Sequence, residues 1–143
     1  MPFSATVCVW SFLRCPQAFT GCALTWTLLA EVGDALAGYA QLRRAGGAPD
    51  GVPGIAPIEL WRIYVDAPWH GSGLGAQLLR AAAETARGLG GDALWLSVWE
   101  RNPRAIRFYD KSGMRIIGRA DFLIGGEVQN DHVMAAPLAR LLA

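Results

Sequence analysis

Short apolar runs, rich in branched and aromatic residues and separated by glycine, proline or asparagine, predict that much of the chain forms β-strands. The pair Gly33-Asp34 between the first two runs predicts the turn of a β-hairpin. Strands are expected over residues 25–32, 35–43, 58–65, 93–99, 114–119 and 131–137, whereas residues 1–20 show no clean periodicity.

Two segments have helical periodicity. The first begins at the glycine loop of residues 70–75 and runs to about Arg87. The second has Asn102 as its expected N-cap and Pro103 at its first helical position, and it ends at Gly113. The inward face of the first helix is expected to consist of Leu74, Leu78, Ala81, Ala82 and Thr85.

The order of these elements is a hairpin, then strand–helix–strand, then a helix and two more strands. This order predicts a single domain over residues 1–143, an α+β or α/β sandwich built on a mixed sheet. Trp95 and Trp99 fall on one side of their strand, which is expected to face the core.

Composition removes several classes of function. The net charge is +1 and no long run of like charges occurs, so no nucleic-acid partner is expected. No uninterrupted apolar stretch reaches about 20 residues, so no membrane span is expected. The cysteines Cys8, Cys15 and Cys22 could share a helix face at their seven-residue spacing, but they match no zinc pattern. Their odd count fits a reducing cytoplasm, and neither a metal nor a catalytic triad is expected.

Gly71, Gly73 and Gly75 lie between a buried strand and a helix N-terminus. Without Cβ atoms, such a loop can turn several backbone N–H groups toward one point. Together with the helix dipole, these donors predict a phosphate-binding site.

The same loop formally fits the dinucleotide fingerprint Gly71-x-Gly73-x-x-Ala76, with Glu100 as a candidate ribose-binding acid. Two features oppose this alternative. Residues 66–70 separate the strand from the first glycine, and the residues after 99 offer one helix and two strands rather than further βα units.

The run His70-Gly71-Ser72-Gly73-Leu74-Gly75 resembles the acetyl-CoA-binding signature of the GNAT superfamily of N-acetyltransferases, with histidine at a position usually occupied by arginine or glutamine. A second element of that family is matched by Asn102, Ala105, Phe108, Tyr109 and Gly113.

The resemblance covers about residues 24–138, and a bacterial branch that includes polyamine acetyltransferases is the most similar. It implies a mixed, largely antiparallel sheet with splayed central strands, flanked by helices. Residues 1–23 are atypical and imply an abbreviated N-terminal lobe. The implied activity moves an acetyl group from acetyl-CoA to a primary amine of a small molecule or peptide, by direct attack of the amine.

The resemblance also implies roles for individual residues. Tyr109 is expected to be the general acid for the leaving thiolate, and Glu59 the general base, through a water molecule if needed. Phe108 is expected to face away, into the core. Acetyl-CoA is expected to contact Ile63, Tyr64, Val65, His70, Gly71, Ser72, Gly73, Leu74, Gly75, Ala76 and Asn102.

Two other functions remain open at this stage. A noncatalytic acyl-CoA-binding module would explain a short N-terminal lobe. An enzyme that acetylates aminoacyl-tRNA would need a basic surface, which the near-neutral charge disfavours. The apolar N-terminal segment also predicts a homodimer.

Overall fold

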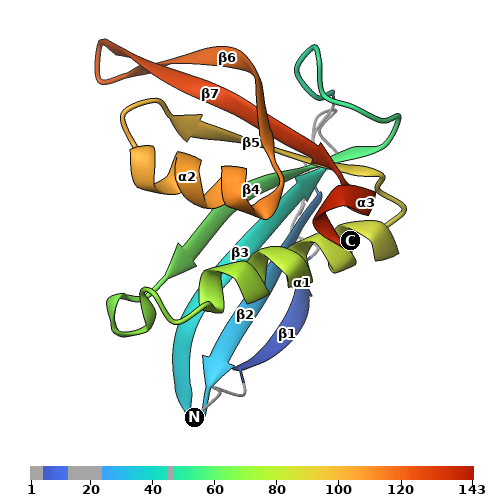
Figure 1. The fold of residues 1–143 in the computed structure, drawn as a ribbon, viewed down its shortest axis with the longest axis vertical. Helices are drawn as coiled ribbons and strands as arrows, with labels where there is room; N and C mark the ends of the chain where they lie inside the picture. Colours follow the sequence, from blue (N-terminus) through green and yellow to red (C-terminus); the bar gives the residue numbers. More distant parts are fainter. Residues whose placement is uncertain (1–4, 13–23, 45–46) are drawn as a thin grey trace.

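The computed structural model describes residues 5–12, 24–44 and 47–143. The first element along the chain is a strand, and the last strand is followed by one short helix (Figure 1). The elements are β1 (Ala5–Phe12), β2 (Leu24–Val32), β3 (Ala35–Arg44), β4 (Pro57–Val65), the 3₁₀ turn η1 (Ala67–Trp69), α1 (Leu74–Gly88), β5 (Ala93–Trp99), α2 (Pro103–Ser112), β6 (Arg115–Ile124), β7 (Glu127–Pro137) and α3 (Leu138–Leu141).

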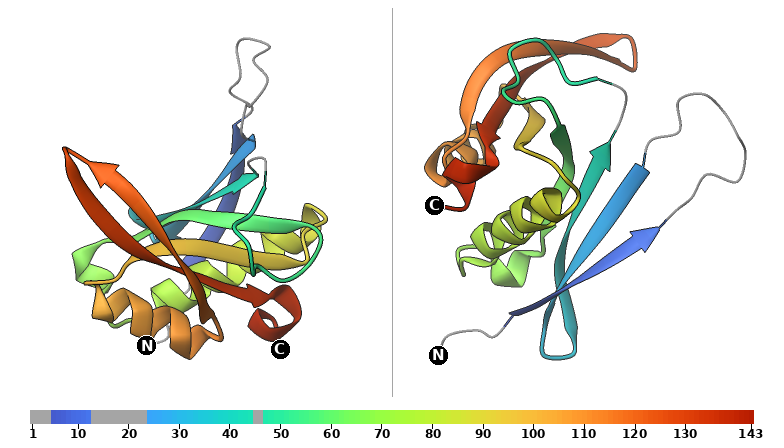
Figure 2. Two further views of the ribbon diagram at one scale, coloured as in Figure 1. Left: turned by 90° about the horizontal axis from the view of Figure 1, so that it is seen from above. Right: turned by 90° about the vertical axis from the view of Figure 1, so that its right-hand side faces the viewer.

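The strands form one seven-stranded sheet in the order β1-β2-β3-β4-β5-β7-β6. Only β4 and β5 pair in parallel, and the other neighbours are antiparallel. The expected mixed, largely antiparallel sheet is therefore confirmed. The three helices lie on the same side of this sheet (Figure 2).

The two central strands diverge. Pairing between β4 and β5 is confined to the first three residues of each, Pro57–Glu59 with Ala93–Trp95. Beyond that point β4 continues to Val65 and β5 to Trp99 without pairing to each other. On its other side β4 remains paired to β3, with a register shift around Trp61 that marks a β-bulge. The expected splay is confirmed.

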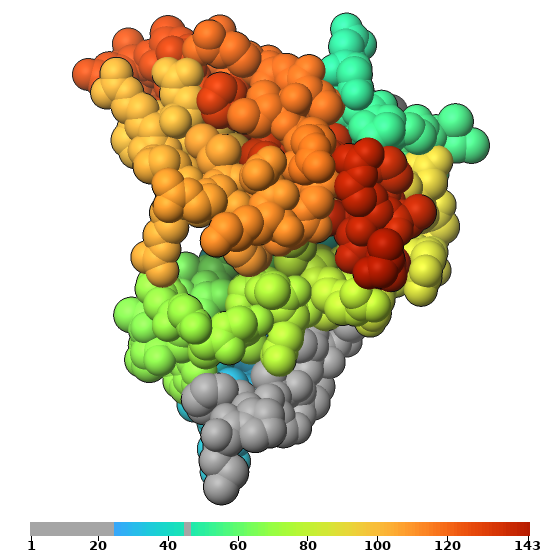
Figure 3. Space-filling model, in the orientation of Figure 1, coloured from blue at the N-terminus to red at the C-terminus, as the bar shows by residue number. Residues whose placement is uncertain are grey.

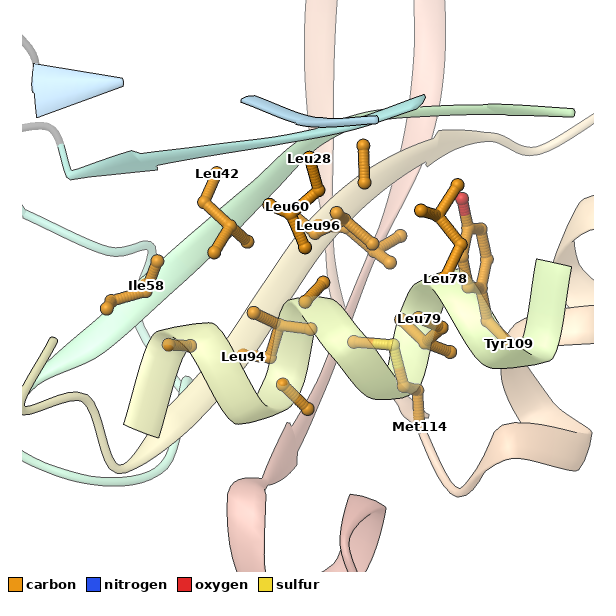
Figure 4. Packing of buried hydrophobic residues seen from close by; sticks show 14 of the residues in the cluster. Leu28, Leu42, Ile58, Leu60, Leu78, Leu79, Leu94, Leu96, Tyr109 and Met114 are labelled. Atoms are coloured by element: carbon orange, nitrogen blue, oxygen red, sulfur yellow. The ribbon is translucent and has the colours of Figure 1, made fainter. Parts of the chain in front are cut away.

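The core lies between the sheet and α1. Leu78 of α1 belongs to one buried cluster with Leu28, Leu60 and Leu96, which come from three different strands (Figure 4). Burying each such leucine contributes about 1.5–3 kcal/mol, so this layer contributes substantially to stability. The buried residues of α1 are Leu74, Leu78, Leu79, Ala82, Ala83 and Ala86. Ala81 and Thr85, expected on this face, are only half-buried, because the helix turns its face slightly the other way.

The expectations for the first and the last strands need correction. Residues 5–12 form β1, although no periodicity suggested an element there, and Cys8 therefore lies on a strand rather than a helix. The strands β6 and β7 extend well beyond residues 114–119 and 131–137 and form a long hairpin. Cys15, Cys22 and most of the apolar N-terminal segment lie outside the described residues.

The expectation that Trp95 and Trp99 fill the core is also wrong. Trp95 is half-buried and Trp99 is 46% exposed. The helices cover the other face of β5, where Leu94, Leu96 and Val98 are buried. None of the helices in the described part of the chain is long and apolar enough to cross a membrane.

Candidate active site

A cavity of about 540 Å³ opens where β4 and β5 diverge. Its wall is formed by the end of β4, the glycine loop, the first turn of α1 and one face of α2. On the surface, the hollow separates the green atoms around the loop from the orange atoms of α2 (Figure 3). The lining residues are Ile63, Tyr64, Val65, Trp69, His70, Gly71, Gly73, Gly75, Ala76, Asn102, Arg104, Ala105, Phe108 and Tyr109.

Local hydrogen bonds hold the glycine loop against the end of β4. The Asp66 carboxylate caps η1 by accepting the N–H of Ala67 at 3.0 Å. The His70 ring donates from Nε2 to the Val65 carbonyl at 2.7 Å, and the Ser72 hydroxyl donates to the Trp69 carbonyl. The loop therefore reaches α1 in one defined shape.

Two positions of the loop require glycine. Gly71 and Gly73 have φ values of +77° and +87°, where a side chain would be strained, and a Cβ atom on either would project into open space. A ligand can thus approach the loop backbone closely.

The start of α1 supplies unused donors. Its first intrahelical bond runs from the Gln77 N–H to the Gly73 carbonyl, so the N–H groups of Gly75 and Ala76 have no acceptor within the helix. The Arg104 side chain adds a cation, and the lining residues include no carboxylate. Helix dipole, free amides and cation together favour an anion such as phosphate.

The wall from β4 offers backbone groups. Ile63, Tyr64 and Val65 line the cavity on the segment that has left β5, so their β5-facing peptide groups have no strand partner. An extended ligand could pair with this edge as an added strand.

Helix α2 provides the opposite wall. The Asn102 side chain accepts the Ala105 N–H at 3.2 Å, which confirms it as the N-cap and leaves its amide N–H₂ group to donate elsewhere. Tyr109 lies two helical turns further on and lines the same cavity. Its ring stands beside Leu78, at the end of the core nearest the start of α1 (Figure 4).

Burial raises the pKa of the Tyr109 hydroxyl to about 12. The phenol therefore stays protonated throughout the neutral range and is available as a hydrogen-bond donor. It is a weaker acid than an exposed tyrosine, so full transfer of its proton requires that another proton replace it.

Comparison with known proteins agrees with this geometry. Residues 8–114 match the Acetyltransferase (GNAT) family. The chain belongs to this family. That membership removes the dinucleotide-binding alternative, which would also require further βα units that the fold does not have.

The relatives of this GNAT chain include an uncharacterized N-acetyltransferase of Mycobacterium tuberculosis, 37% identical over 103 residues that cover 72% of this chain and 61% of that protein. The spermine/spermidine N(1)-acetyltransferase of Bacillus subtilis is 34% identical over 66 residues, 46% of this chain and 43% of that protein. The crystal structure of nourseothricin acetyltransferase superposes with a TM-score of 0.66 at 27% identity, covering 80% of this chain and 65% of that one. The GNAT chain thus spans about three fifths of its mycobacterial relative.

Most of the residues expected to contact acetyl-CoA meet in the cavity of this GNAT chain; the exceptions are Ser72 and Leu74. The Ser72 N–H donates to the Trp69 carbonyl, and the Leu74 N–H lies 3.4 Å from the Ser72 hydroxyl oxygen. These two residues shape the loop from within instead of lining it.

The expectation that Phe108 faces away into the core is confirmed only in part, because Phe108 packs against the core but also lines the cavity. Its ring lines the cavity and lies 3.4 Å from the position that a Cβ atom on Gly75 would take. Phe108 thereby lies against the first turn of α1, and a Cβ atom at residue 75 would meet its ring at ordinary van der Waals distance. Its ring centroid is 5.2 Å from that of Tyr109.

Glu59, the candidate base, does not line the cavity. It is buried on the paired part of β4, where Arg43 bonds both of its carboxylate oxygens, at 2.8 and 3.0 Å. Its position therefore does not favour the base role, which stays a prediction.

Sequence reasoning missed Arg104 as a site residue. The signal was available, because the residue two places after an N-cap lies on the first turn of its helix, near whatever Asn102 faces. Within the described residues, no three side chains of His, Cys, Asp or Glu gather as metal ligands would.

Proposed function

We infer that this GNAT chain transfers the acetyl group of acetyl-CoA to a primary amine of a small molecule or peptide. The observation that carries the proposal is the cavity beside the diverging strands, which is lined both by the start of α1, with its free amides, and by Tyr109. The free amides and Arg104 suit the pyrophosphate of a coenzyme A, and the unpaired edge of β4 suits its extended pantetheine arm.

Bound acetyl-CoA would supply an activated thioester carbonyl, and the chain's own groups would do the rest. The backbone N–H groups of residues 63–65 would hold the arm and polarise the carbonyl oxygen. Removing one such donor in other enzymes costs about 10²–10³ in rate, so this contribution is large. The Asn102 amide would orient the arm from the opposite wall.

Tyr109 would donate to the departing sulfur. Because the pKa of its hydroxyl is about 12, its proton would move only as the newly bonded nitrogen gives up one of its own. The amine attacks directly in this scheme, so no acetylated side chain forms. An ammonium group must first lose a proton, and water entering the open side of the cavity would accept it, since no carboxylate lines the wall.

The relatives suggest which amines to test first as acceptors. A relative named as a spermine/spermidine acetyltransferase makes polyamines the first amines to examine. Amino acids, aminoglycoside-like amines and peptide N-termini belong in the same panel.

The test has two stages. Calorimetric titration should find saturable binding of acetyl-CoA and none of NADH, which has a pyrophosphate but no pantetheine arm. Thiol release should then follow with at least one amine of the panel. Binding of NADH alone would contradict the proposal.

A second candidate is an acyl-CoA-binding module without turnover. One observation favours it: no helix in the described ranges covers the sheet face opposite α1, so an acceptor site there has no wall from those residues. Binding of acetyl-CoA without thiol release from any amine would support this second candidate over the first.

A further inference from the structure

Strand β6 forms one edge of the sheet, paired to β7 on one side only. Four of its apolar side chains are exposed, and Leu123 reaches 76%. An exposed edge strand with unpaired backbone groups is a site where another strand can add. Proteins protect such edges with charged side chains, proline or a bulge. Residues 115–124 (RIIGRADFLI) carry a bulge at 116–118 and three charged residues, but the segment 122–124 has no such protection. The exposed apolar residues are Ile116, Phe122, Leu123 and Ile124.

The sequence of this edge is complementary to itself. If two copies of β6 pair antiparallel about Ala120, Arg119 faces Asp121 of the other copy, and Asp121 faces its Arg119. Phe122 then lies opposite Gly118, where an aromatic ring covers the position that lacks a side chain.

The two neighbouring symmetric registers oppose like charges. In an antiparallel pair, two facing residues point to the same face of the sheet, and side chains alternate faces along each strand. Facing residues must therefore be an even number of positions apart in the sequence. The two-fold axis of a symmetric pair then passes between the two copies of one residue. An axis through Asp121 would oppose two carboxylates, and one through Arg119 would oppose two guanidinium groups. Only the axis through Ala120 turns both charges into opposite-sign pairs.

We propose that this chain forms a symmetric dimer by antiparallel pairing of two β6 edges about Ala120, which joins the two sheets into one. Regular pairing spans residues 118–122. At one end it is limited by the bulge between Ile116 and Gly118 and by Gly51, whose Cβ position would be 3.7 Å from the Ile117 carbonyl oxygen.

A neighbouring contact competes with the charged pair. Arg119 donates to the Glu100 carboxylate at 2.9 Å, and because Glu100 follows β5, this contact holds the guanidinium over β7, on the side away from the free edge. The arginine side chain must turn toward the edge to offer its N–H groups to a second carboxylate. In the dimer, Asp121 of the other copy would provide it.

Sedimentation equilibrium of the full chain should show a monomer–dimer equilibrium. Asp121→Arg places like charges in both pairs and should raise the dissociation constant at least about tenfold. Arg119→Asp should do the same. The matched control is Asp34→Arg in the β2–β3 turn, an exposed reversal away from β6, which should leave the dissociation constant unchanged.

Mixing the two charge-reversed variants distinguishes the loss of a dimer contact from the loss of the fold. A mixture of the Asp121→Arg and Arg119→Asp chains restores opposite charges in both pairs and should form a heterodimer, and the double variant should dimerise again with itself. A monomer at the highest concentration tested would overturn the proposal. A dimer that Asp121→Arg does not weaken, or single variants that do not recombine, would overturn it as well.

Discussion

Arg43 binds both carboxylate oxygens of Glu59 across the β3–β4 pair, from Nε at 2.8 Å and from Nη2 at 3.0 Å. The guanidinium carbon of Arg43 also lies 4.4 Å from the centroid of the Trp61 ring, at the β4 bulge. A buried carboxylate with both oxygens bonded to one arginine is held in a fixed ion pair, which makes a structural role the better explanation of Glu59.

Replacing Glu59 with glutamine tests that explanation. Glu59→Gln removes the charge that balances Arg43 and should lower the free energy of unfolding by about 1–3 kcal/mol, measured by urea denaturation. The value of kcat should stay within a few-fold of the wild type, with the acid side of its pH profile unchanged. If instead turnover disappears while stability is kept, Glu59 is the base after all.

A conservative change at Tyr109 tests the donor role. Tyr109→Phe keeps the ring that packs against the core and removes only the hydroxyl, so affinity for acetyl-CoA by calorimetry should be unchanged. Turnover should fall by about 10²-fold or more, because a donor to the leaving sulfur is lost. The matched control is Tyr64→Phe, since Tyr64 also lines the cavity but its hydroxyl bonds Asp66. Equal losses in both variants would count against Tyr109.

The raised pKa of Tyr109 has a consequence for stability at high pH. Its pKa is about 12 in the folded protein and about 10 in the unfolded chain, so below pH 10 both states keep the proton. Above pH 10 the unfolded chain releases a proton that the folded protein retains, and stability falls as pH rises toward 12.

Between pH 10 and pH 11, the free energy of unfolding of the wild type should therefore fall by about 1 kcal/mol more than that of Tyr109→Phe. Urea denaturation of both proteins at the two pH values measures the difference. Parallel losses would show that Tyr109 ionises like an exposed tyrosine.

Local signals explain which parts of the fold could be predicted. The hairpin, the helix starts and Asn102 as N-cap depend on turn residues and capping side chains that act within a few positions. The face of β5 could not be assigned, because both of its faces are apolar and only the position of α1 decides between Leu96 and Trp95. The contact between Phe108 and Gly75 likewise depends on how two helices pack.

The same distinction between local and long-range determinants applies to the candidate site. Its glycine loop could be predicted from residue type, since positive φ at Gly71 and Gly73 is a local property. The pairing of Glu59 with Arg43 depends on a strand register that the bulge at Trp61 sets, and no local pattern encodes that register.

Arg104 should contribute to binding the coenzyme through charge alone. Arg104→Gln should weaken acetyl-CoA affinity about two- to fivefold at low ionic strength, and the difference should shrink as salt is added, because the side chain is exposed. Arg107→Gln is the control, an exposed arginine on the same helix that does not line the cavity. A salt-independent loss, or an equal loss at Arg107, would contradict a direct ion contact.

Gly73 should be the most sensitive position of the loop. In Gly73→Ala, the new methyl group occupies the open space against the loop, and the residue is strained by about 1–2 kcal/mol at a φ of +87°. Calorimetry should show a large loss of acetyl-CoA affinity, while circular dichroism still shows a folded protein. Gly88→Ala is the matched control, since Gly88 also faces open space but has no positive φ and ends α1 far from the loop. If Gly73→Ala binds acetyl-CoA as the wild type does, the pyrophosphate does not rest on this loop.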